Sequence, residues 1–324
     1  MNVFLWESND HNFDPLLEKI LAPINSLLLP GKTVFIKPNL CKVPVSRYDM
    51  EMSITNPELI CQLALYIKHL GCRVIIGDAN SPRPTETVEK IYSFTKLENL
   101  SSHGIELINI SHDKQCFIND HPDFRYFGLS SAMLAADVII NLCKLKTHSI
   151  TGYTGALKNL WGAIPRNDRM LLHHKMYKLL FELNSIYKPQ LTIMDAVHCM
   201  HGRGPTNGKP IDMNLLLSSS NGIALDYIAN KLIGFDPKSI KHLNYALLNC
   251  EFNTSSIETI TDSGKPVLSY SKKFEPAILD LPNRITLYLQ RFPFFSHHIV
   301  MNDTFFQPVK KFINVLRRIH LLPE

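Results

Sequence analysis

Short apolar runs of strand length alternate with amphipathic segments of helix length through most of this chain. Because strands that alternate with helices pair into parallel βαβ units, this pattern predicts an α/β fold. We expect a mainly parallel, Rossmann-like layered sheet flanked by helices, with an additional helical tail at the C-terminus. The expected strands are residues 2–7, 32–39, 73–80, 105–110, 137–145, 191–197 and 213–220. The expected helices are 13–28, 55–71, 84–97, 129–136, 155–164, 170–187, 224–236 and the segment after Pro237.

The alternation weakens beyond Asn249, and this sets the predicted domain organisation. We expect residues 1–250 to form the α/β domain and residues 251–324 a mostly helical extension that is basic and apolar. Between Arg284 and the end, six Lys or Arg stand against two acids, a difference of +4 within a net charge of +5. The preceding body is close to neutral, so we expect no nucleic-acid partner. The tail is typical either of a helix packed on the domain or of weak docking to a membrane surface or a protein.

Cysteine usage and hydropathy predict the compartment. The seven cysteines contain no CxxC pair, which argues against both a tetrathiolate metal centre and a disulfide framework. No run reaches the roughly 18 apolar residues of a membrane-spanning helix, and the N-terminus lacks the pattern of a secretory signal. We expect a cytoplasmic protein.

Polar residues of catalytic type follow four of the expected strands. Ligands of parallel sheets bind beyond the carboxyl ends of the strands, so we expect these side chains to line one cleft. In extended backbone Lys144, Lys146 and His148 share one face, which predicts three potential cations directed into one space. The full set is Lys37, Asn39, Asp78, Asn80, Lys144, Lys146, His148 and Asp195.

The stretch SITGYTGALKN, which follows His148, predicts an anion-binding turn. Gly155 opens the expected helix, and Thr151 or Thr154 can cap it. Free N–H groups at a helix start attract a phosphate or carboxylate, and Lys158 and Asn159 are close enough in sequence to reach the same ligand. The stretch matches neither GxxxxGK[ST] nor GxGxxG, so the known nucleotide-binding loops have no support.

The segment DAVHCMHGRGPTNGKP forms a second cluster, and two interpretations stay open. Asp195, His198 and His201 are residue types that bind divalent metals, but their spacing matches no compact zinc signature. A structural aspartate beside two incidental histidines is at least as well supported. Gly204 and Thr206 lie in the same shaped loop and are expected to contact the substrate.

Further candidates lie outside these two clusters. His173, in RMLLHHKMYKLL, is of a type that titrates near neutral pH, and it is expected either to act as an acid or base or to lie solvated at the edge of the core. Arg166 and Arg169 could close over an anion or flank a lid. Among the cysteines, Cys41 directly after IKPNL is the candidate for reactivity.

Five motifs follow one another in the chain: IKPNL at 36–40, GD at 77–78, ADVIINLCKLKTH at 136–148, TGALKNLWG at 154–162 and DAVHCMHGRGPTNGKP at 195–210. In this order they resemble the domain of unknown function 362 family. The resemblance implies an α/β fold and a distant similarity to lactate-racemase-like proteins, which is analogy alone. Many relatives carry paired CxxC motifs for iron–sulfur clusters, and this chain lacks them, so we expect no cluster. Relatives often have a histidine near His173, which favours a function for it, whereas His201 stands where relatives often place Glu.

These residues predict an enzyme that acts on a small anionic metabolite bearing a phosphate or carboxylate. His148 would transfer a proton, oriented by Asp78 or Asp195, and Lys37 and Lys158 would neutralise developing charge. Isomerisation, group transfer and redox chemistry all stay open, and an imine at Lys144 or Lys146 is one route. The alternative is a non-catalytic ligand- or cofactor-binding protein, or a redox-accessory protein related to ferredoxin-fused homologues. The sequence identifies no cofactor and leaves a divalent metal open.

Overall fold

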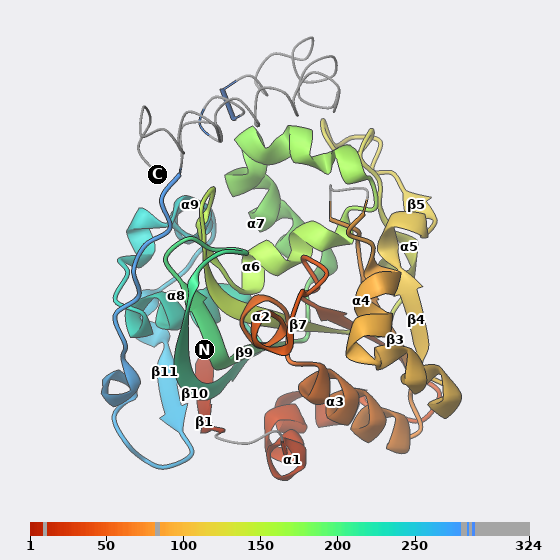
Figure 1. The fold of residues 1–324 in the computed structure, drawn as a ribbon, viewed down its shortest axis with the longest axis horizontal. Helices are drawn as coiled ribbons and strands as arrows, with labels where there is room; N and C mark the ends of the chain where they lie inside the picture. Colours follow the sequence, from red (N-terminus) through yellow and green to blue (C-terminus); the bar gives the residue numbers. More distant parts are fainter. Residues whose placement is uncertain (9–11, 82–84, 280–283, 285–286, 289–324) are drawn as a thin grey trace.

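The computed structural model describes residues 1–8, 12–81, 85–279, 284 and 287–288, and the statements below concern these residues. Most of their strands belong to one sheet, and two short strands form a separate pair (Figure 1). The sheet contains β1 (Asn2–Glu7), β2 (Thr33–Pro38), β3 (Arg73–Asp78), β4 (Glu106–Asn109), β7 (Val138–His148), β8 (Gly152–Thr154), β9 (Leu191–His201), β10 (Lys209–Ser219) and β11 (Glu258–Thr261); the separate pair is β5 (Gln115–Cys116) and β6 (Leu129–Ser130).

Strand order and direction confirm the predicted fold class. The order is β11-β1-β10-β9-β7-β2-β3-β4, with β8 paired to β7. The strands from β9 to β4 are parallel to their neighbours, whereas β10 is antiparallel to both β9 and β1. The sheet is therefore mixed but mainly parallel, and the carboxyl ends of β2, β3, β7 and β9 lie at one edge, as predicted.

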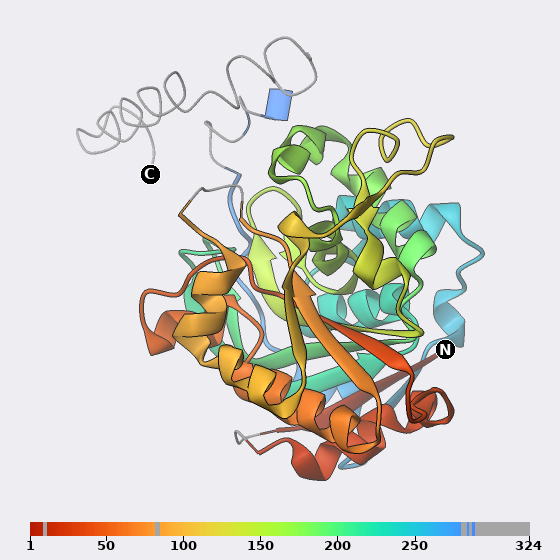
Figure 2. The same cartoon turned by 90° about the vertical axis from the view of Figure 1, so that its right-hand side faces the viewer.

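Helices cover both faces of this sheet (Figures 1 and 2). Val34 and Ile36 of β2 pack into the hydrophobic cluster on the face of α1, α3 and α4, whereas Phe35 packs into the cluster on the face of α6 to α9. A strand that is buried on both faces needs apolar residues at consecutive positions, which explains the continuous apolar runs of the sequence. The helices are α1 (Asp14–Leu21), α3 (Pro57–His69) and α4 (Val88–Thr95) on one face, and α6 (Ala156–Asn159), α7 (Met176–Tyr187), α8 (Gly222–Leu232) and α9 (Lys241–Asn249) on the other.

Helix α3 shows how closely local sequence sets a boundary. The Asn56 side chain accepts a hydrogen bond from the backbone N–H of Glu58 at 2.9 Å, and Pro57 occupies the first helical position. Gly71, just beyond the end, has φ of +86°, a conformation that costs glycine little. The helix predicted at 55–71 is therefore confirmed, and these residues set its two ends.

Of two stretches expected to be loops, one contains a helix and the other is a hairpin turn. Helix α2 (Arg47–Ser53) lies in a stretch expected to be a loop, where the Ser46 side chain accepts from the N–H of Asp49 at 3.1 Å and caps it. The loop expected at 201–210 is confirmed as a hairpin turn, but it is slightly shorter, because β9 continues to His201 and β10 begins at Lys209.

Other expected helices are shorter than predicted. The helix expected at 170–187 begins at Met176, after a 3₁₀ segment at Asn167–Lys175. The one expected at 13–28 becomes 3₁₀ at Ala22–Leu27, close to Pro23, as its proline suggested. The remaining helix of the described chain is α5 (Ser131–Leu134).

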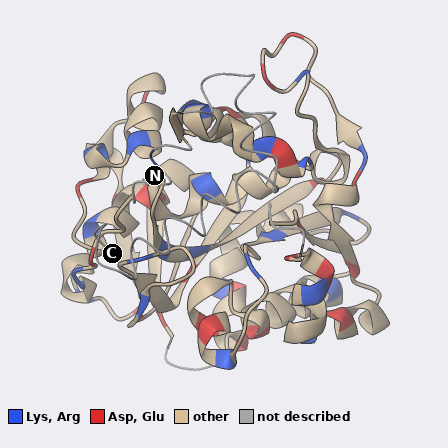
Figure 3. Cartoon of the chain, turned by 45° about the horizontal axis from the view of Figure 1, so that its top comes forward, with Lys and Arg blue, Asp and Glu red and all other residues tan. Residues whose placement is uncertain are grey.

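The C-terminal extension contributes to the main sheet. Strand β11 pairs with β1 in parallel, so the sheet continues past residue 250. Most of the expected helical tail, including residues 289–324, lies outside the described residues. Within the described part, no helix has the length and apolar character needed to cross a membrane. Figure 3 shows Lys and Arg interspersed with Asp and Glu on the outer helices.

Candidate functional site

Two buried ion pairs lie at the carboxyl ends of the central strands. The Lys37 ammonium is 2.6 Å from an Asp78 carboxylate oxygen, and the Lys144 ammonium is 2.7 Å from Asp195. These four residues are at most 5% exposed. Burial lowers the pKa of Lys37, and the Asp78 carboxylate opposes this by raising it. These four residues therefore converge at the strand ends, as predicted. Within each pair, however, the aspartate neutralises the charge of the lysine.

Each aspartate of these pairs also holds backbone in place. The second Asp78 oxygen accepts from the N–H of Leu40 at 2.7 Å, and Asp195 accepts from the N–H of Asn56 at 2.8 Å. Lys144 and Asp195 are in register across β7 and β9, which brings their side chains together. Asp78 and Asp195 thus fix the loop after β2 and the start of α3, and neither is free to orient His148.

An asparagine network ties β2 and β7 to α6. Asn39 donates to the side-chain oxygen of Asn159 at 3.0 Å, and Asn159 donates to Asn141 at 2.8 Å. Asn141 in turn donates to the carbonyl of Ala156 at 2.9 Å. Asn39 and Asn159 were both expected to contact substrate, but their side chains form the hydrogen bonds that link these elements.

The start of α6 already holds a carboxylate from the protein. Asp226 of α8 accepts from the N–H groups of Ala156 and Leu157 at 2.7 and 3.0 Å, and from the Tyr153 hydroxyl at 2.8 Å. Burial raises the pKa of Asp226 to about 6, and these hydrogen bonds act in the opposite direction. The expectation that these N–H groups bind a ligand is corrected, because an internal anion occupies them.

The residues expected to cap this helix do not cap it. Thr151 donates to the carbonyl of Tyr153 at 2.9 Å, and the Thr154 hydroxyl is buried without a partner among the described residues. At Gly155, an added Cβ would lie 2.3 Å from Asp226, so only glycine admits the carboxylate.

Lys146 and Lys158 have different environments. The Lys146 ammonium donates to the carbonyl of Ser53, at the end of α2, and lies 3.0 Å from the Cys41 sulfur. Lys158 is partly buried, and no described residue forms a hydrogen bond or ion pair with its ammonium. Burial, then the nearby Lys146, Arg169 and Lys37, lower the pKa of Lys158 to about 8, while Cys41 raises it.

Arg169 adds a third cationic group. Its guanidinium donates to the carbonyls of Asn80 at 2.6 Å and Arg166 at 3.1 Å, while Nε is buried without a partner among the described residues. Burial lowers the pKa of Arg169 to about 10, so it stays protonated at neutral pH. We call Lys146, Lys158 and Arg169 the cationic site.

Two histidines border the cationic site in the neutral form. His148 Nδ1 accepts from the N–H groups of Ile150 and Thr151 at 3.1 and 3.4 Å, which leaves the proton on Nε2. Burial and then Lys158 lower the pKa of His148 well below 6.5 and that of His173 to about 3. In this tautomer His148 Nε2 is a hydrogen-bond donor, which favours binding an oxygen over abstracting a proton. The His173 ring stacks on Trp161 with centroids 5.6 Å apart.

The three residues considered for a metal do not converge. Asp195 forms an ion pair with Lys144. His198 Nδ1 is 2.8 Å from Asp212, and His201 Nδ1 accepts from the N–H of Glu275. No group of three His, Cys, Asp or Glu within the described chain is arranged to hold a metal ion. The interpretation of a structural aspartate beside two incidental histidines fits this geometry.

The glycine-rich hairpin turn packs against the end of β7. The Thr147 hydroxyl donates to the carbonyl of Gly202 at 3.1 Å, and the N–H of Ser149 donates to the carbonyl of Gly204 at 3.1 Å. An added Cβ at Gly204 would lie 2.1 Å from the Thr147 carbonyl oxygen, so glycine is required by this close approach. Thr206 lies partly buried in the same turn.

Sequence reasoning missed three residues that matter here. Asn141 is a polar residue inside the apolar run VIINLC, and Asp226 lies in the apolar helix segment ALDYIANKL. Both are buried polar groups among apolar neighbours, a signal that could have found them. His242, buried near Lys158, gives no such signal because its segment is mixed.

The chain is similar to one curated protein and, more distantly, to two solved structures. Thylakoid-associated protein sll1697 of Synechocystis sp. is 28% identical over 234 residues, which cover 69% of this chain and 71% of that protein. The lactate racemase apoprotein from Thermoanaerobacterium thermosaccharolyticum aligns with a TM-score of 0.45 at 11% identity, covering 71% of this chain and 57% of that one. A Thermotoga maritima protein aligns with a TM-score of 0.34 at 11% identity, covering 60% and 52%. This chain therefore spans only a little over half the length of each solved structure.

The motif-based resemblance is confirmed by a family model. The model described as Domain of unknown function (DUF362) matches residues 34–231. Because this match spans more than half of the chain and includes every strand end of the site, the chain belongs to the DUF362 family.

Proposed function

We propose that this protein binds a small anionic metabolite, through its phosphate or carboxylate, at the cationic site. The observation that carries the proposal is the Lys158 ammonium, which has no hydrogen bond or ion pair with any described residue although Lys146, Arg169 and Lys37 lie near it. Asp78, an acid that raises the pKa of Arg169, already forms an ion pair with Lys37 and accepts from backbone N–H groups.

The physical argument is one of charge balance. Cations gathered out of water raise one another's free energy, and an opposite charge is needed to offset the repulsion and the lost hydration. A phosphate or carboxylate provides that charge together with several acceptor oxygens. The Nε2–H of His148 adds a neutral donor at the same place.

Binding of inorganic phosphate to the Lys158→Met variant tests the proposal. A hydrogen bond to a charged group contributes about 1.5–3 kcal/mol, so titration calorimetry should show phosphate affinity falling by about tenfold to a hundredfold. The control is Lys19→Met, which removes an exposed lysine of α1. Equal phosphate affinity in wild type and Lys158→Met would reject the site.

Lys158 also favours a second candidate function, an enzyme that forms an imine. An amine with a pKa of about 8 is partly deprotonated near neutral pH, and the neutral amine is the nucleophile. It would add to a substrate carbonyl carbon, and the carbinolamine would then lose water to give the imine. The sequence favoured Lys144 or Lys146 for this role, but Lys144 is locked in its ion pair and Lys146 is bonded to Ser53.

Borohydride trapping distinguishes the two candidates. With pyruvate as the probe, an imine-forming enzyme would gain a reduced adduct on Lys158, found by peptide mass spectrometry and absent from Lys158→Met. A binding protein would show no adduct while still binding phosphate.

A further inference from the structure

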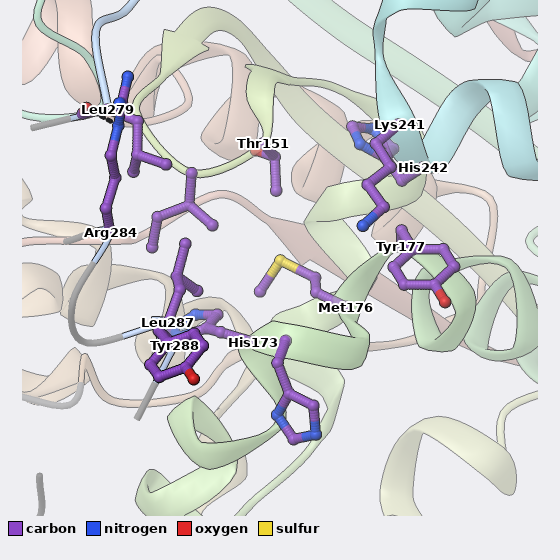
Figure 4. Close-up of a pocket in the computed structure, with 12 residues that line it drawn as sticks. Thr151, His173, Met176, Tyr177, Lys241, His242, Leu279, Arg284, Leu287 and Tyr288 are labelled. Atoms are coloured by element: carbon purple, nitrogen blue, oxygen red, sulfur yellow. Dashed lines mark hydrogen bonds between the residues drawn. The ribbon is translucent and has the colours of Figure 1, made fainter. Parts of the chain in front are cut away.

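A cavity of about 320 Å³ is lined by His173 and His242 among other described residues (Figure 4). Its walls come from the turn between β7 and β8, from the segment leading into α7, from the start of α9, and from described residues of the C-terminal segment. Pockets that bind small molecules span about 300–1,000 Å³. The cavity therefore has room for a single ring or a short chain.

The cavity and the cationic site share a border. His173 lines the cavity, and the nearby Lys158 and Arg169 contribute to its lowered pKa. Lys158 likewise acts on His242, which lies on the far wall. The anionic group of a ligand held at Lys158 would therefore lie near the cavity walls that His173 and His242 form.

His242 is a buried polar residue of the cavity wall with unmet hydrogen-bonding capacity. The residue is 1% exposed, and neither ring nitrogen has a hydrogen-bond partner among the described residues. Its ring is parallel to that of Tyr153, with centroids 6.5 Å apart. Burial and Lys158 lower the pKa of His242 to about 3, so the ring is neutral, with one donor and one acceptor. A ligand hydroxyl can satisfy either role.

Several other residues of the cavity wall are apolar, and two basic ones already interact with neighbouring groups. Met176, Leu279 and Leu287 present hydrocarbon to the cavity. The Lys241 ammonium lies 4.2 Å from the centre of the Tyr177 ring, and Arg284 donates from Nε to the Leu279 carbonyl. This lining suits an uncharged body better than a second anionic group.

We propose that the cavity holds the uncharged body of the ligand, an aromatic ring or short chain with a hydroxyl that hydrogen-bonds to His242. This inference rests on the proposed function, because the anionic group of the same ligand is held at the cationic site. The three cationic residues lie within the family match at 34–231, whereas the α9 and C-terminal walls lie beyond it. Those walls therefore select which anionic metabolite this particular chain accepts.

A series of three phosphates tests the inference on the unmodified full chain. Calorimetry would compare inorganic phosphate, phenyl phosphate and 4-hydroxyphenyl phosphate. We expect phenyl phosphate to bind at least about tenfold more tightly than phosphate, and the hydroxyl to tighten binding further. If phosphate binds and phenyl phosphate binds no more tightly, the inference is overturned and the proposed function stands. If none of the three binds, the proposed function itself fails.

Two variants locate the effect in the cavity. His242→Phe keeps the ring beside Tyr153 but removes both nitrogens, so it should abolish the preference for the hydroxylated ligand. Leu287→Trp adds bulk to the wall and should bring the affinity for phenyl phosphate close to that for phosphate. His103→Phe, at an exposed position, is the matched control for the first substitution. Unchanged affinity ratios in both cavity variants would overturn the inference.

Discussion

The side chains of four lysines near the strand ends have different environments. Lys37 and Lys144 are each paired with a buried aspartate, Lys146 donates to a helix-end carbonyl, and Lys158 has no partner of either kind among the described residues. The side chain alone therefore does not decide whether a cation stabilises the fold or is available to a ligand. The carboxylate or carbonyl that the fold brings to its ammonium decides it.

Anion binding should weaken as the pH rises past the pKa of Lys158. Burial and neighbouring cations lower that pKa to about 8, so the ammonium is charged at neutral pH and loses its proton above about pH 8. Calorimetric titration with sulfate, whose own charge is constant in this range, should show affinity falling by up to about tenfold per pH unit above the pKa. A flat profile between about pH 6.5 and 9.5 would show that Lys158 does not hold the anion.

Lys144→Met should destabilise the fold strongly. It leaves the Asp195 carboxylate, 0% exposed, without its counter-ion. Removing one partner of a buried ion pair costs about 3–5 kcal/mol. Urea denaturation would measure the loss, with Lys19→Met as the exposed control. A near-wild-type free energy of unfolding would mean that Asp195 is compensated by other groups.

The sequence predicted which residues reach the strand ends but not what they do there. The period of two correctly placed Lys144 and Lys146 at the site. Their partners, Asp195 and Ser53, come from β9 and α2, which are distant or were not expected as elements. Pairing between such segments is set by the tertiary fold.

At the scale of elements, α6 depends on a carboxylate from another helix. It is only four residues long, and a helix of this length is unstable by itself. Asp226 of α8 supplies acceptors for two of its N–H groups and links it to Tyr153. The position of Lys158 and Asn159 on α6 therefore depends on a residue more than sixty positions away.

Asp226→Ala should destabilise the protein and displace Lys158. It leaves three buried donors without acceptors, and one such loss costs about 1–3 kcal/mol. Urea denaturation should show a loss at or above that range, and phosphate affinity should fall with it. Asp120→Ala, at an exposed loop position, is the control. Intact stability would show that water replaces the carboxylate at the start of α6.

Elements buried on both sides were predictable, and short polar ones were not. The strands of the central sheet followed from continuous apolar runs, and α3 from its cap, proline and glycine. Helix α2 was missed because RYDMEMS has too few apolar positions to show a helical period. Its place is set by the contacts of its buried residues with the sheet, which no local pattern encodes.

On the scale of the whole molecule, the C-terminal segment completes both the sheet and the cavity. Strand β11 covers the edge of β1, and the backbone of residues 272–275 is bonded to Leu232, Ile233 and Gly202. The location of the protein in the cell stays a prediction, and its relative in Synechocystis sp. is named as thylakoid-associated.

A chain ending at Asn249 should be less stable and more prone to associate than one ending at Tyr288. The shorter chain exposes β1 as an unpaired edge, which favours strand addition between molecules. It also removes Phe274, a residue that is 1% exposed. Thermal unfolding and size-exclusion chromatography would compare the two. Equal melting temperatures and monomeric elution of both would contradict this role of β11.

The sequence by itself determined the α/β class, the strands at the core, the family and the residues that gather at one edge of the sheet. These follow from periodicity, capping and local motifs, which are properties of neighbouring residues. Only the tertiary structure decided that Asp226 fills the helix start, that Lys144 is neutralised and that Lys158 is not. The reason is physical: the free energy of a buried charge depends on its distance to the opposite charge, and those charges lie on elements far apart in the chain.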